Sequence, residues 1–148
     1  MILTLRASLI LLIVAVFSAC ANVPAPQIQS PELTTNTASI VASRDGAYMF
    51  VMLDIAEELQ ENTYALIQYQ QLSNPQRYRT LELGAIGESR RLTFKSRPDK
   101  IVHTDTAYSV LFRLYSSATY SQVVAQRSIL IMPNIPQKIA DLMDIQLR

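Results

Sequence analysis

Residues 101–116, IVHTDTAYSVLFRLYS, are the stretch that decides the fold. From residue 106 to residue 115 apolar and other side chains alternate, which places Tyr108, Val110, Phe112 and Leu114 on one face. Alternation with a period of two is typical of a β-strand that buries one of its faces. The stretch therefore predicts a core strand.

The residues that enter this strand carry a second signal. Val102 stands six residues before Tyr108 and Thr106 two before it, in the order Val-His-Thr-Asp-Thr-Ala-Tyr. This pattern resembles the tyrosine corner of fibronectin type III and immunoglobulin-like sandwiches, although Thr104 stands where a proline is usual. The resemblance implies that the phenol of Tyr108 bonds back to the backbone upstream.

Other strand candidates occur at short intervals, with turn residues between them. Residues 47–55 are expected to form a strand. A helix over residues 48–59 is the competitor, but the valine and aromatic content and the strand-like run that follows favour the strand. Residues 78–86 and 89–95 look like two arms of a hairpin around Gly87 and Glu88. The remaining candidates are residues 39–42, 63–72 and 122–132. About seven strands of this spacing predict an all-β fold, an antiparallel two-sheet β-sandwich of immunoglobulin or fibronectin III type.

The C-terminus allows two interpretations. Ile139, Leu142, Met143 and Leu147 recur at helical spacing, so residues after Pro136 are expected to form a short helix with one apolar stripe, capped by Asn134 or Ile135. A terminal strand over residues 142–147 is the alternative.

The N-terminus has the layout of a secretion signal. One positive charge, Arg6, precedes an apolar run that is too short to span a bilayer comfortably and that ends in small residues. Residues 9–20 read LILLIVAVFSAC, and their end, Phe17-Ser18-Ala19-Cys20, resembles the lipobox of bacterial lipoproteins. The resemblance implies cleavage before Cys20 and acyl chains on that cysteine. An ordinary signal peptide or an uncleaved anchor is the alternative.

These signals divide the chain into three parts. Residues 1–19 are the expected signal peptide, residues 20–37 a lipidated cysteine with a proline-rich tether, and residues 38–148 a single β-sandwich domain. Ala21 after the cysteine, instead of aspartate, implies by analogy the outer membrane, with the periplasmic side preferred. The membrane is thus one expected partner.

The sequence offers no catalytic set, and we expect no enzyme, cofactor or metal. The only histidine, His103, lies in a predicted loop, and no serine stands in a G-x-S-x-G context. Glu57, Glu58 and Glu61 form a link between strands, where acidic residues are usually solvated. Loss of residues 1–19 removes one positive charge and leaves a net charge near zero, which argues against a nucleic-acid partner.

Two surfaces are candidates for binding a partner. Arg91, Lys95 and Arg97 fall on the outward face of a predicted strand, where they either bind an acidic partner or block edge pairing. Ile139, Leu142 and Met143 are the second set, which either packs back on the sandwich or fits the groove of a partner. The expected function is a non-enzymatic adaptor or scaffold for another envelope protein. A glycan- or peptidoglycan-binding module is the alternative.

Overall fold

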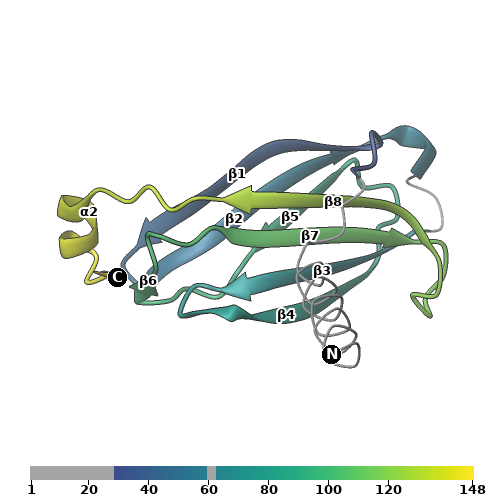
Figure 1. The fold of residues 1–148 in the computed structure, drawn as a ribbon. Helices are drawn as coiled ribbons and strands as arrows, with labels where there is room; N and C mark the ends of the chain where they lie inside the picture. Colours follow the sequence, from purple (N-terminus) through teal and green to yellow (C-terminus); the bar gives the residue numbers. More distant parts are fainter. Residues whose placement is uncertain (1–28, 60–62) are drawn as a thin grey trace, which may run out of the picture.

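Two antiparallel sheets pack face to face in the computed structural model, which describes residues 29–59 and 63–148 (Figure 1). The first sheet, sheet A, has the order β1-β2-β5, and the second, sheet B, has the order β4-β3-β7-β8. The predicted all-β sandwich is therefore confirmed. The strand bounds are Leu33–Ser43 (β1), Gly46–Ile55 (β2), Tyr64–Gln71 (β3), Asn74–Ala85 (β4), Arg91–Lys95 (β5), Tyr108–Tyr115 (β7) and Val123–Ile131 (β8).

Smaller elements close one end of the sandwich. The two-residue strands β6 (Ile101–Val102) and β9 (Gln146–Leu147) pair in parallel, and the helix α2 (Gln137–Leu142) precedes β9. A single 3-10 turn, η2 (Glu57–Leu59), follows β2. Both interpretations of the C-terminus are thus correct in part, because a short helix and a short strand follow one another.

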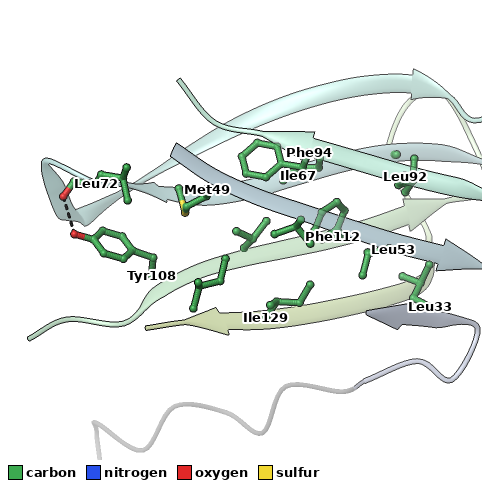
Figure 2. Close-up of a cluster of buried hydrophobic side chains, with 14 of the residues drawn as sticks. Leu33, Met49, Leu53, Ile67, Leu72, Leu92, Phe94, Tyr108, Phe112 and Ile129 are labelled. Carbon is green, nitrogen blue, oxygen red and sulfur yellow. Dashed lines mark hydrogen bonds between the residues drawn. The ribbon is translucent and has the colours of Figure 1, made fainter. Parts of the chain in front are cut away.

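The core lies between the sheets and consists of the inward residues of the alternating strands (Figure 2). The rings of Phe94 and Phe112 meet edge to face across the two sheets, with centroids 6.3 Å apart. Tyr69 of β3 packs against Phe94 at 4.8 Å, which places β5 over β3. The inward face predicted for the strand after residue 106 is buried in full.

Tyr108 makes the corner contact that residues 102–108 predict. Its hydroxyl accepts a hydrogen bond from the backbone N–H of His103 at 2.8 Å and donates to the carbonyl oxygen of Leu72 at 2.9 Å (Figure 2). Burial is the main cause that raises the pKa of this phenol. One buried side chain therefore joins the entry to β7 with the turn that connects β3 and β4.

The predicted hairpin around Gly87 and Glu88 is wrong. β4 pairs with β3, and β5 pairs with β2, so the two expected arms belong to different sheets. The reason is burial: Leu92 and Phe94 of β5 fill the core, whereas β4 keeps most of its side chains exposed. The segment after Gly87 crosses between the sheets.

The domain also begins earlier than residue 38. β1 starts at Leu33, whose side chain is fully buried and which pairs with Ile55, rather than at Ser39. Gln29 and Ser30 already bond to β8, with the Ser30 N–H 2.9 Å from the Gln126 carbonyl oxygen. The residues between Leu33 and Thr37 read as tether because most of their side chains are polar and exposed. Of the expected tether, residues 20–28 lie outside the described part of the chain.

The apolar stripe predicted for the C-terminal helix faces the core only in part, because Met143 and Leu147 pack against the core but Ile139 and Leu142 do not. Ile139 and Leu142 are exposed, and Ala140 and Ile145 are the buried residues instead. The helix ends at Leu142, so Leu147 lies on β9 and not on the same helical face. Pro136 occupies the N-cap without a side-chain hydrogen bond, and the expected caps Asn134 and Ile135 lie before it.

Candidate partner-binding surface

The predicted basic residues of β5 lie on the free edge of sheet A. Arg91 and Lys95 are exposed and point away from the core, because the alternating Leu92 and Phe94 point into it. The Arg91 Nε donates to an oxygen of Asp54 at 2.8 Å, and the Lys95 ammonium lies 4.1 Å from the centre of the Tyr48 ring. Both cations therefore have partners within the chain.

Asp54 of β2 bonds to side chains of both neighbouring strands. It accepts hydrogen bonds from the Asn36 amide at 3.0 Å and from Arg91, and these two bonds hold the pKa of its carboxyl below the usual value. The carboxylate thereby links all three strands of sheet A through their side chains. Such exposed contacts contribute little to stability but fix the direction of the Arg91 side chain.

Arg97 differs from the other two, because it forms neither an ion pair nor a cation–π contact with any described residue. It lines a hollow of about 150 Å³ together with Tyr69, Gln71 and Asp99. Asp99 accepts hydrogen bonds there from the backbone N–H groups of Ser73 (3.2 Å) and Ile101 (3.0 Å). Sequence reasoning missed this structural role, although a Pro-Asp pair is a common turn signal.

β4 forms the most accessible surface, and the sequence did not predict it as a site. Leu81 lies opposite the buried Ile67, so both side chains point to the inner face of sheet B. Leu81 is nevertheless 40% exposed, because sheet A ends at β5, which lies over β3 and leaves β4 uncovered. β4 is therefore an overhang that lies along the lower border of the sandwich in Figure 1.

The overhang is also basic. Arg79 lies opposite Tyr69 on the same inner face as Leu81, and Arg77 precedes it on β4. Neither arginine has an ion pair with a described residue, and both are exposed. We call the inner face of β4 with the adjacent edge of β5 and Arg97 the open seam.

The second predicted set lies elsewhere. The Lys100 ammonium donates to the carbonyl oxygens of Met143 and of Arg44, both at 2.8 Å, and so ties the end of α2 to the turn between β1 and β2. Arg91 pairs with Asp54 near the other end of β2. The structure thus does not bring Ile139, Leu142 and Met143 together with the basic residues of β5.

The expected lipidation residue, Cys20, lies outside the described residues. In the described ranges, no three histidine, cysteine, aspartate or glutamate side chains come close enough together to hold a metal ion. Glu57 and Glu58 are exposed on η2, and Glu61 is not among the described residues. Within the same ranges, no helix has the length and apolar character needed to cross a membrane.

By architecture the chain belongs to the all-β proteins with an antiparallel sandwich. No model of a known protein family matches the sequence, and no curated protein matches it. Among solved structures, it is similar to the crystal structure of DesR, a β-glucosidase from Streptomyces venezuelae in complex with D-glucose, at 14% identity and a TM-score of 0.25. That match covers 66% of this chain, which spans 14% of the length of DesR.

Proposed function

We propose that this protein is a lipid-anchored, non-enzymatic adaptor of the bacterial envelope, held in the outer membrane by acyl chains on Cys20. It positions a protein partner at the open seam, on the periplasmic side. The observation that carries the proposal is the overhang of β4. A long edge strand with an uncovered inner face is a liability for a free protein, and an added strand would remove it.

The chemistry of the seam identifies the kind of partner. A segment that adds beside β5 would become a fourth strand of sheet A and would cover Leu81. It would also lie next to Arg79 and Arg97, neither of which forms an ion pair with a described residue. We therefore propose a partner with an extended, acidic segment, for which backbone hydrogen bonds supply affinity and the arginines supply specificity.

The tether suits such a role. Because Gln29 already bonds to β8, the part of the chain between Cys20 and the domain has about half the length of the tether expected from the sequence. Fully extended, it reaches roughly 30 Å. The domain would therefore hold its partner close to the bilayer rather than far out in the periplasm.

The glycan-binding alternative has less support. Aromatic stacking on a sugar ring needs an exposed ring face, and Tyr78 is the only tyrosine in the described ranges whose side chain is largely exposed. Its hydroxyl is already bonded to Ser109 at 3.0 Å.

Photo-cross-linking in living cells tests the adaptor proposal. A photoreactive residue at position 81 should give one discrete protein adduct, and the same residue at the exposed Thr119 in the loop before β8 should give none. In the background of the double variant Arg79→Glu, Arg97→Glu, we expect the adduct to fall at least several-fold at equal protein level. Adducts of equal yield from both positions, or an adduct that both charge reversals leave unchanged, would contradict the proposal.

A further inference from the structure

Several large apolar side chains are exposed along β8 and directly after its end. Leu130 is 72% exposed and Met132 58% exposed, and Val123 and Val124 at the other end of the strand are also open to solvent. Ile129 and Ile131 alternate with Leu130 and Met132 and fill the core. We call these four exposed residues the β8 surface.

The N-terminal segment of the domain enters along this same strand. The Gln29 amide bonds both backbone groups of Ser128, donating to its carbonyl at 3.1 Å and accepting from its N–H at 3.0 Å. Ser30 bonds to both backbone groups of Gln126 in the same way, at 2.9 Å each. From Gln29 to Ser30 the chain runs opposite to β8, and Gln29, the first described residue, lies beside Ser128, two residues from Leu130.

This entry argues against a second copy of the chain as the occupant. Pairing of two β8 strands needs free backbone groups along the edge, and Gln29 and Ser30 already use those of Gln126 and Ser128. Contact with a bilayer needs no backbone hydrogen bonds, so the bonds that Gln29 and Ser30 make to β8 do not prevent it.

The charge of this side fits a bilayer with anionic headgroups. The stretch from β7 to β8, residues 108–131, contains no aspartate or glutamate. Of its two cations, Arg113 alternates with the core residues of β7 and so lies on the outer face, whereas Arg127 is bonded to Thr35 of sheet A. Arg113 lies opposite Gln126 of β8. No carboxylate in this stretch would be repelled by acidic lipids.

We infer that the β8 surface rests on the lipid bilayer that holds the anchor, with Leu130 and Met132 at the headgroup level. The inference deepens the proposed function, on whose anchor at Cys20 it rests. The tether keeps the domain within roughly 30 Å of the bilayer. At the resulting high local concentration, a small apolar patch is enough for contact. The open seam lies at the other border of sheet B, because β4 and β8 are its two edge strands, and so remains free for a partner.

Depth-dependent quenching on vesicles tests this orientation. The full-length protein would be purified with its anchor and reconstituted into vesicles of phosphatidylethanolamine and phosphatidylglycerol. The acyl chain blocks the only native cysteine thiol, so Leu130→Cys and the matched control Thr93→Cys, on the outer face of sheet A, can each carry one environment-sensitive fluorophore. Thermal unfolding of both labelled proteins confirms that they are folded.

The inference predicts that spin-labelled lipids quench the fluorophore at position 130 several-fold more than the one at position 93, with a blue-shifted emission at position 130. Equal quenching at the two positions on vesicles that carry the protein would overturn the orientation and leave the anchor intact. Energy transfer between copies labelled at position 130 without lipid quenching would overturn it as well, in favour of self-association. Protein that does not float with the vesicles would overturn both this inference and the anchor.

Discussion

Tyr108 shows how one side chain can hold two distant parts of a sandwich together. Its ring belongs to the core, and its hydroxyl satisfies one backbone donor, from His103, and one backbone acceptor, from Leu72. Both groups lie in connections, where no strand ladder would pair them. The tyrosine-corner resemblance from Val102 to Tyr108 predicted a bond to the upstream backbone, which the contact with His103 confirms, but not the contact with Leu72, which is distant in the sequence.

Removal of this hydroxyl tests its structural role. Tyr108→Phe leaves the ring in place but leaves buried backbone groups without their partner, so the free energy of unfolding should fall by about 1–3 kcal/mol. Tyr64→Phe is the matched control, since the Tyr64 hydroxyl has no hydrogen-bond partner within the described residues, and it should stay within about 0.5 kcal/mol. Denaturant unfolding measures both. Equal losses for the two variants would show that the corner contact is not specific.

The same phenol predicts a pH dependence. Burial raises the pKa of Tyr108 above its ordinary value of 10.0 in the folded state, so the unfolded chain releases this proton at lower pH than the folded chain does. The stability that this group contributes is complete below about pH 10 and is lost as the pH rises through the higher folded-state value. Between about pH 9 and about pH 11, the free energy of unfolding should therefore decline more steeply with pH for the wild type than for Tyr108→Phe. Parallel declines would contradict the shift.

At the scale of elements, local pattern predicted strands well and strand pairing poorly. β2, β7 and β8 show alternating or continuous apolar residues, a pattern that does not depend on which strand lies beside them. The sequence predicted a strand at each of these positions. The pairing partner of β5 could not be predicted from this pattern, because Leu92 and Phe94 would alternate in the same way whether β5 paired with β2 or with β4. The overhang of β4, which is the basis of the candidate site, follows from that non-local pairing.

The start of the domain was missed for a related reason. The polar run after Leu33 resembles a tether, and its membership of β1 follows from its pairing with the distant strand β2. Gln29 bonds to β8 through its side-chain amide, which makes the two hydrogen bonds to Ser128 that the backbone of a paired strand would otherwise make. Neither contact has a local signature in the sequence.

The turn that opens β2 gives a prediction at this scale. Gly46 has a φ of +129°, and a Cβ there would lie 2.5 Å from the Asp99 carbonyl oxygen, so Gly46→Ala should cost about 3 kcal/mol or more. Gly87→Ala is the control, because its φ of +64° is strained but its surroundings are open, and it should cost about 1–2 kcal/mol. Thermal or denaturant unfolding would rank the two. A Gly46 variant as stable as the Gly87 variant would argue against the close approach of Asp99 to this turn.

At the scale of the whole molecule, the two edge strands of sheet B would have different roles. β8 contacts Gln29 and, as inferred above, would contact the bilayer, whereas β4 at the other edge of sheet B would stay open toward the periplasm under the proposed function. Sequence composition pointed to an adaptor by the lack of a catalytic set, but the surface that would bind the partner emerged only from the count of strands in each sheet. Of the expected basic set, Arg97 is the residue at this seam that has neither an ion pair nor a cation–π contact within the described residues.

Both proposals depend on the anchor, and the intact mass of the mature protein from isolated membranes tests it most directly. The account predicts a chain that begins at Cys20 and carries acyl chains on that residue, found in the membrane fraction. It also predicts that Cys20→Ala is found outside that fraction without the added mass. A mature chain that begins at another residue or carries no acyl chain would contradict the account, as would a Cys20→Ala variant that stays in the membrane.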